Sequence, residues 1–132
     1  MAWAKNPASK YHAKKVVSPD GTVFDSKKEY KRYSELCLLQ KGGYIRGLHR
    51  QVPFLLIPEH REQDTIGPRG GKKKGRIIER RLEYIADFTY EELLPDGSWA
   101  YIVEDCKGMR TREYIIKRKL MLHVYDIILR ET

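Results

Sequence analysis

The residues best suited to chemistry in this sequence are Asp87, Asp105 and Lys107. Asp105 and Lys107 stand two apart near the end of an expected strand. Their side chains should therefore share one face, about 7 Å apart at roughly 3.3 Å per residue. A carboxylate can hold a hard cation, and an ammonium beside it can orient water or stabilise a developing negative charge. A plain surface ion pair explains the triplet Asp105-Cys106-Lys107 equally well, so the rest of the chain must decide.

A predicted hairpin brings the two aspartates together. Residues 77–90 and 99–107 both have strand character, and Pro95-Asp96-Gly97 between them is a strong turn signal. Asp87 and Asp105 lie symmetrically about this turn, so in a simple antiparallel hairpin they face each other within reach of a shared ion.

Two carboxylates held this close repel each other, so the pKa of one should rise unless a cation intervenes. Asp87 stands among apolar neighbours and should be partly buried, where a carboxylate needs a partner or a metal. The alternative partner for Asp87 is an arginine such as Arg81.

A helix is expected from Asp25 to about Lys41, where two glycines end it. Ser26 followed by Glu29 fits a capping box, which gives Glu29 a structural role. Glu29 also lies at the polar end of a buried stripe that points toward the sheet, where a metal could use it. Both interpretations stay open.

The chain of 132 residues carries a net charge of +8 and has a pI of about 9.5. Its length fits one domain, and the basic surplus suits a polyanionic partner. No apolar run reaches the roughly 20 residues that span a bilayer, and we see no signal peptide, so we expect no membrane partner. Cys37 and Cys106 lack metal-ligand spacing and are expected to be reduced thiols of a cytoplasmic protein.

We divide the chain into a basic N-terminal arm (1–23) and a single domain (24–132) that includes a basic flexible loop (59–76). Residues 48–57 should form the first core strand, at an edge or bulged because of Pro53. Residues 112–122 should form a helix capped by Thr111, and 124–129 an internal strand parallel to its neighbour. The residues expected to contact nucleic acid are Lys14, Lys15, Arg69, Lys72, Lys73, Lys74, Arg110, Arg112 and Lys117.

The order helix, three strands, helix, strand, with Glu29, Asp87 and Asp105-x-Lys107, resembles the PD-(D/E)xK nuclease superfamily. More closely, the arrangement looks like small phage Holliday-junction-resolvase-like endonucleases. The resemblance covers about residues 24–130. It implies an α/β fold with a restriction-endonuclease-like αβββαβ core, in which a central mixed sheet is flanked by helices. The chain departs from junction resolvases in carrying Asp105 where they usually have Glu, and a bulge could let Glu104 take its place.

The resemblance implies a metal-dependent DNA endonuclease, structure-specific for branched DNA, acting as a homodimer in the cytoplasm (of the host, if phage-encoded). The implied catalytic residues are Glu29, Asp87, Asp105 and Lys107. The implied ligands of one or two Mg²⁺ ions, for which Mn²⁺ could substitute, are Asp87, Asp105, Glu29 and the Cys106 backbone carbonyl. Two alternatives remain: a non-catalytic nucleic-acid-binding module on the same fold, or a nuclease for flap, single-stranded or plain duplex DNA.

Overall fold

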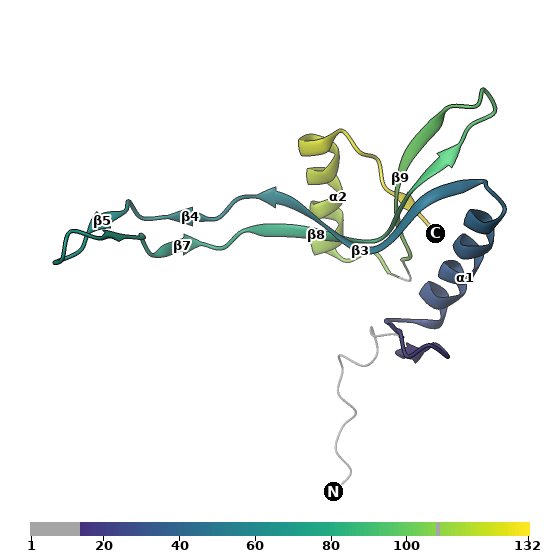
Figure 1. Cartoon of the computed structure of the whole chain (residues 1–132), viewed down its shortest axis with the longest axis horizontal. Helices are drawn as coiled ribbons and strands as arrows, with labels where there is room; N and C mark the ends of the chain where they lie inside the picture. Colours follow the sequence, from purple (N-terminus) through teal and green to yellow (C-terminus); the bar gives the residue numbers. More distant parts are fainter. Residues whose placement is uncertain (1–13, 108) are drawn as a thin grey trace, which may run out of the picture.

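The computed structural model describes residues 14–107 and 109–132 and has a mixed α/β fold with a central mixed sheet and two helices (Figure 1). The sheet has the order β10-β9-β8-β3, with β10 parallel to β9 and the other neighbours antiparallel. Its strands are β3 (Ile45–Ile57), β8 (Leu82–Leu93), β9 (Trp99–Asp105) and β10 (Arg130–Glu131), and the helices are α1 (Lys27–Lys41) and α2 (Arg112–Tyr125).

A small hairpin of β1 (Val16–Val17) and β2 (Val23–Phe24) precedes α1, and its turn is closed by a hydrogen bond from the Gly21 N–H to the Ser18 carbonyl. Phe24 is buried and its ring packs against Tyr30 and Tyr33 of α1. The hairpin therefore fixes the start of the helix on the protein body. The predicted basic arm falls largely on residues 1–13, which lie outside the described part of the chain.

The bounds of α1 follow its capping signals. The side chain of Ser26 accepts a hydrogen bond from the Glu29 backbone N–H at 3.1 Å, which satisfies one of the free donors of the first turn. The helix ends at Lys41, and Gly43 then adopts a positive φ of 83° that favours glycine. Both ends match the sequence prediction.

The β8–β9 hairpin has the predicted register. Phe88 pairs with Glu104 and Leu93 with Trp99, so the pairs are symmetrical about Asp96. Gly97 has the positive φ (85°) that this turn requires. The edge position predicted for Pro53 is also confirmed, because β3 is the outermost strand and pairs only with β8 within the central sheet.

The buried residues of β8 change neighbours between Ala86 and Phe88, a point that we call the bend, and this change divides the core in two. Tyr84 and Ala86 pack in one cluster with Tyr114 and Met121 of α2. Two residues further on, Phe88 packs in a second cluster that includes Leu36 of α1 and Tyr90. Figure 1 shows β3 and β8 curving together through this region.

In a regular strand the even-numbered side chains of residues 82–90 would share one face, and the bend prevents this. The neighbouring strand gives the physical reason. Gln51 lies between the β3 residues paired with Phe88 and Ala86, and its φ is 52°. A left-handed residue interrupts the regular alternation of an extended strand. The side chains before and after it therefore meet different helices.

The C-terminal strand also differs from the prediction. Val124 and Tyr125 belong to α2, and Asp126 ends the helix in a left-handed conformation (φ 57°). The strand that follows, β10, spans only two residues and lies at the edge of the sheet, not inside it. Its parallel pairing with β9 after a helical crossover is as predicted.

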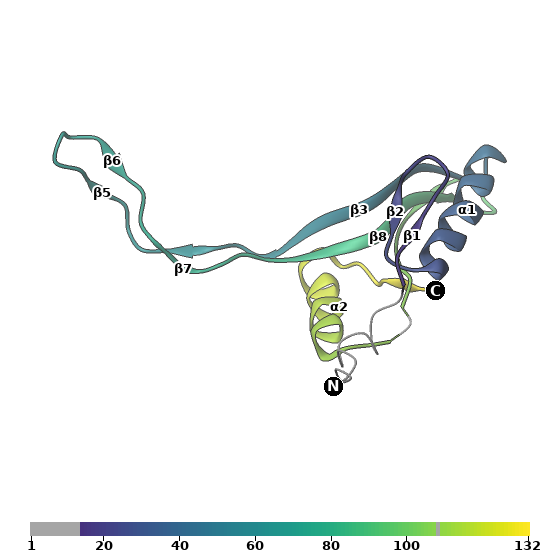
Figure 2. The ribbon, with the colours of Figure 1, turned by 90° about the horizontal axis from the view of Figure 1, so that it is seen from below.

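The segment expected to be a flexible loop, residues 59–76, forms most of a long hairpin arm that extends away from the body (Figures 1 and 2). In it, β4 (His60–Arg61) pairs with β7 (Ile77–Glu79), and β5 (Thr65–Ile66) pairs with β6 (Lys72–Lys73). Backbone hydrogen bonds between these short strands replace the loop. Within the described residues, neither helix is long and apolar enough to cross a membrane.

Candidate functional site

A cleft of about 300 Å³ lies between the bend of β8, the end of β9 and the first half of α2. Four residues predicted from the sequence line it: Asp87, Asp105, Lys107 and Lys117. The other lining residues were not predicted as part of a site, namely Glu83, Tyr84, Ile85, Thr111, Glu113 and Tyr114.

Asp105 is the most deeply buried carboxylate of the cleft, with 2% of its surface exposed. The hydroxyl of Tyr84 donates a hydrogen bond to its Oδ2 atom at 2.5 Å. Its Oδ1 atom lies 3.1 Å from the Lys107 ammonium, yet this buried oxygen has no hydrogen bond of good geometry among the described residues. One oxygen of Asp105 is therefore held fixed while the other keeps capacity for a ligand.

Asp87 lies beside Asp105 and is held there by the residue that follows β9. Its Oδ2 atom accepts a hydrogen bond from the Cys106 backbone N–H at 2.8 Å. Burial, followed by the charge of Asp105, raises the pKa of Asp87 from 3.8 to about 7. The charge of Asp105 thus acts on Asp87 as expected from the sequence, and Arg81, the alternative partner of Asp87, pairs with Glu83 instead.

Lys107 is positioned from three directions. Its ammonium contacts Asp105 and lies 4.4 Å from the centre of the Tyr114 ring, a cation–π contact. Its backbone carbonyl accepts a hydrogen bond from Nζ of Lys28 in α1 at 3.0 Å. Its side chain is 30% exposed, so the ammonium can reach a ligand that enters the cleft.

Glu29 is buried but is held beside the cleft without lining it. Its carboxylate accepts a hydrogen bond from the Gln51 side chain at 3.1 Å and lies 3.7 Å from the Arg50 guanidinium. Burial is the main cause that raises its pKa, and its charge in turn contributes to the raised pKa of Asp87. The sequence left open whether the Glu29 side chain serves the helix cap or points toward the sheet, and in the structure it points toward the sheet.

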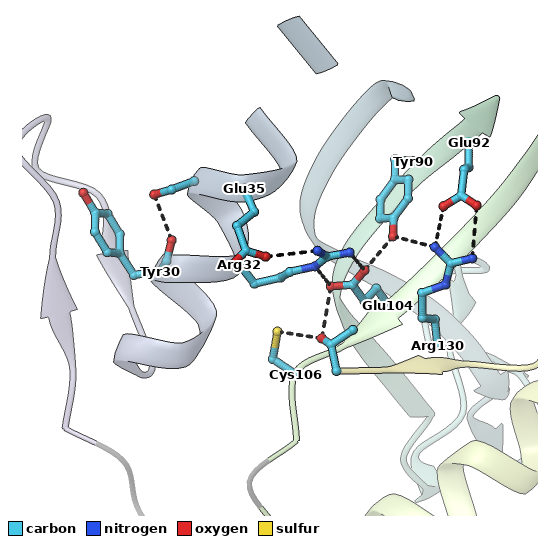
Figure 3. A network of polar contacts seen from close by, with 10 residues as sticks. Tyr30, Arg32, Glu35, Tyr90, Glu92, Glu104, Cys106 and Arg130 are labelled. Carbon is cyan, nitrogen blue, oxygen red and sulfur yellow. Dashed lines mark hydrogen bonds and ion pairs between the residues drawn. The ribbon is translucent and has the colours of Figure 1, made fainter. Parts of the chain in front are cut away.

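Glu104 lies on the other face of β9 (Figure 3). It is fully buried, and both of its oxygens accept hydrogen bonds from the Arg32 guanidinium, at 2.7 and 3.0 Å. The Tyr90 hydroxyl donates to it at 2.5 Å and the Thr132 hydroxyl at 3.1 Å. With its hydrogen-bonding capacity taken up in this network, Glu104 does not replace Asp105 in the cleft.

The donor set of the cleft fits one hard divalent cation. Asp105 offers an unsatisfied buried oxygen, and burial together with the charge of Asp105 raises the pKa of the neighbouring Asp87, which a bound cation would lower. Mg²⁺ is commonly bound by one or two carboxylates together with water and substrate phosphates. Among the described residues no three His, Cys, Asp or Glu side chains are grouped closely enough to share an ion, so the structure does not bring Glu29 into the predicted set of three carboxylates.

The predicted nucleic-acid-binding residues fall in three places. Lys117 lies in the cleft, where it pairs with Glu113, while Arg110 and Arg112 lie just before and at the start of α2. Lys14 and Lys15 are exposed ahead of β1. The other four lie on the outer part of the hairpin arm, away from the cleft: Arg69, Lys72, Lys73 and Lys74.

Tyr84 and Tyr114 are the functional candidates that sequence reasoning missed. Both stand in apolar stripes, so their pattern indicates core packing. Only the bend at Asp87 brings the Tyr84 hydroxyl to Asp105. The Tyr114 hydroxyl is buried without a hydrogen-bond partner among the described residues, and nothing in its helical spacing could reveal this.

The fold and cleft thus define a mixed α/β protein with a pair of aspartates, Asp105 buried and Asp87 half-buried, and an adjacent lysine. The chain belongs to the family described as Protein of unknown function (DUF1064), which matches residues 8–130. No curated protein and no solved structure gave a significant match.

Proposed function

We propose that this protein is a Mg²⁺-dependent endodeoxyribonuclease of the PD-(D/E)xK superfamily. The observation that carries the proposal is the convergence of Asp87, Asp105 and Lys107 in one cleft. The element order α1, β3, β8, β9, α2, β10 agrees with the restriction-endonuclease-like αβββαβ core of that superfamily, with the arm strands inserted between β3 and β8.

The cleft residues suit phosphodiester hydrolysis. When bound by Asp87 and Asp105, Mg²⁺ supplies Lewis acidity that lowers the pKa of a bound water and neutralises phosphate charge. Tyr84 orients Asp105 through its short hydrogen bond, and the Cys106 backbone N–H orients Asp87. Both carboxylates are therefore preorganised before a substrate arrives.

Lys107 is placed to act on the attacking water or on the phosphoryl group. Its ammonium is fixed between Asp105 and the Tyr114 ring at the edge of the cleft. There it can orient the attacking water or stabilise the negative charge that develops on the phosphoryl oxygens. Lys117, 22% exposed in the same cleft, can contact a phosphate if its pairing with Glu113 loosens.

The substrate class follows from charge and from the resemblance together. A net charge of +8 favours a polyanion, and the resemblance to junction resolvases favours branched DNA. Symmetrical cutting of a junction needs two active sites, so the proposal includes a homodimer.

A substrate panel tests the proposed activity. Purified protein is incubated with four-way junction, flap, single-stranded and duplex DNA, each with Mg²⁺, with Mn²⁺ or with chelator. We expect cleavage in either metal, none with chelator, and the junction cut fastest. Equal cutting of all substrates would retain the nuclease and remove the branch preference. Tight binding without any cutting would favour a non-catalytic DNA-binding module.

A further inference from the structure

We propose that the hairpin arm, residues 58–81, holds duplex DNA about one helical turn away from the cleft and thereby sets a minimum substrate length. This inference rests on the proposed function, because it takes DNA as the ligand of the cleft. It goes further by giving the arm a separate role in affinity, with no part in the chemistry.

The arm is a folded element. Its two sides are joined by a hydrogen bond from the Glu62 backbone N–H to the Arg76 carbonyl at 2.8 Å and by the Gly75 N–H to the Asp64 carboxylate at 2.9 Å. At Gly75 the strands approach so closely that an added Cβ would lie 1.9 Å from the Glu62 carbonyl oxygen. Only glycine fits there. The arm is therefore a defined structure that can hold its outer end at a fixed distance from the protein body.

The acidic residues of the arm are placed so that its outer end keeps a positive surplus. The arm carries eight basic and four acidic residues. Glu59, Glu62 and Asp64 pair with Arg61, Arg76 and Lys72 respectively.

The tip of the arm, residues 65–76, contains no acidic residue. Arg69, Lys73 and Lys74 are exposed there, and within the described chain they have no ion-pair partner. Several unpaired cations on one exposed tip are the arrangement that phosphate contacts require.

The length of the arm determines how far from the cleft its tip can contact DNA. At a rise of roughly 3.3 Å per residue, the segment from Ile57 to Pro68 spans up to about 35 Å. DNA advances about 3.4 Å per base pair, so the tip can meet the duplex about 10 base pairs from its base. The cleft lies on β8 just inside that base, at Tyr84 and Asp87. Figures 1 and 2 show the arm leaving the body in the opposite direction from α1.

Charge favours DNA over a protein partner. The arm has three exposed apolar residues, Ile66, Ile77 and Ile78. Ile66 is the single one within the tip, and Ile77 and Ile78 lie outside it. Isolated apolar side chains of this kind are normal on a surface. The cationic tip, by contrast, has no other explanation in the described structure.

The test compares binding to duplexes of about 10, 20 and 30 base pairs by fluorescence anisotropy, with chelator present so that no cutting occurs. The tip variant carries Arg69→Gln, Lys73→Gln and Lys74→Gln. The matched control carries Lys27→Gln, Lys31→Gln and Lys41→Gln, three exposed lysines of α1 with the same total loss of charge. Circular dichroism and thermal unfolding verify that both variants fold.

We expect the unmodified chain to bind the longest duplex at least about 10-fold more tightly than the shortest one, after correction for the larger number of binding positions on the longer duplex. We call this difference the length gain. The tip variant should lose this gain, and the slope of log K against log salt should fall by about 2 to 3. The control should keep the gain.

Two results would overturn the inference: a tip variant that keeps the full length gain, or a control that loses as much. Cleavage of DNA without any length gain would leave the proposed nuclease standing and remove the arm's role. A length gain with no cleavage of junction, flap, single-stranded or duplex DNA in Mg²⁺ would support the arm and remove the proposed activity. If none of the three duplexes binds, the arm's role is removed, and the substrate panel alone decides the proposed nuclease.

Discussion

The Cys106 backbone N–H donates a hydrogen bond to Oδ2 of Asp87 over 2.8 Å, and this bond ties the end of β9 to the bend of β8. Because Asp105 and Lys107 flank Cys106, the same contact sets the position of all three cleft residues. An N–H donor favours the charged form of Asp87 and so opposes, without cancelling, the burial and the neighbouring charge that raise its pKa.

The first prediction concerns stability and pH without metal. Asp87 ionises near 3.8 when unfolded and near 7 when folded, so the native state binds more protons between these values. Its contribution to stability is present below the lower pKa and is lost as pH rises through about 4 to 7, by at most about 4 kcal/mol.

Asp87→Asn should remove this loss while keeping an oxygen for the Cys106 N–H. Urea unfolding in chelator, measured across the same pH range, should therefore give a flatter profile for the variant than for the unmodified chain. Parallel profiles would show that Asp87 ionises normally in the fold.

The second prediction concerns the metal. Mg²⁺ should raise the unfolding temperature, with a gain of about 2.7 kcal/mol when the ion is at 100 times its Kd. The gain should be larger above pH 7 than below it, because protons compete for Asp87.

Calorimetric unfolding of variants shows whether two carboxylates, Asp87 and Asp105, bind the Mg²⁺ ion or whether Glu29 binds it as well. Asp105→Asn should abolish the Mg²⁺ gain, whereas Glu29→Gln should keep most of it because Gln51 and Arg50 hold the Glu29 carboxylate. Equal loss in both variants would mean that Glu29 is a ligand after all.

The third prediction concerns Tyr84. Tyr84→Phe keeps the ring in the core but leaves Oδ2 of Asp105 without its donor. We expect a loss of about 1–3 kcal/mol in metal-free stability. Mg²⁺ affinity should also fall, since Asp105 is then free to turn. Titration calorimetry with unchanged affinity would show that Tyr84 only fills space.

The fourth prediction concerns Glu104, which the structure places in the core network of Figure 3. Glu104→Gln should lower stability by about 3 kcal/mol, because it removes the buried counter-charge of the partly buried Arg32 guanidinium. Glu35→Gln, which removes the exposed partner of the same arginine, should cost less than about 1 kcal/mol. Equal costs in denaturant unfolding would contradict a buried role for Glu104.

Local signals predicted most of the fold. Caps and glycines gave the ends of α1, the Pro95-Asp96-Gly97 turn gave the register that sets Asp87 level with Asp105, and Pro53 gave the edge strand. These features depend on a few neighbouring residues, so they can be read from spacing alone.

Long-range features escaped prediction. The bend depends on a left-handed Gln51, a conformation that its residue type does not favour, so neither the two-part core nor the Tyr84–Asp105 contact could be foreseen. Residues 59–76 of the arm were expected to be a loop because they form a long, glycine-rich basic stretch between two strands. Its ladders depend instead on cross-strand contacts such as the one at Gly75.

The most direct test of the central claim is the single-turnover rate of DNA cleavage in Mg²⁺ for Lys107→Ala and Asp105→Asn, with Lys31→Gln on α1 as the control. The account predicts that each cleft variant loses at least about 100-fold in rate while the control keeps the rate of the unmodified chain. Cleavage that survives in both cleft variants at the rate of the control would contradict the assignment of this cleft as a nuclease active site.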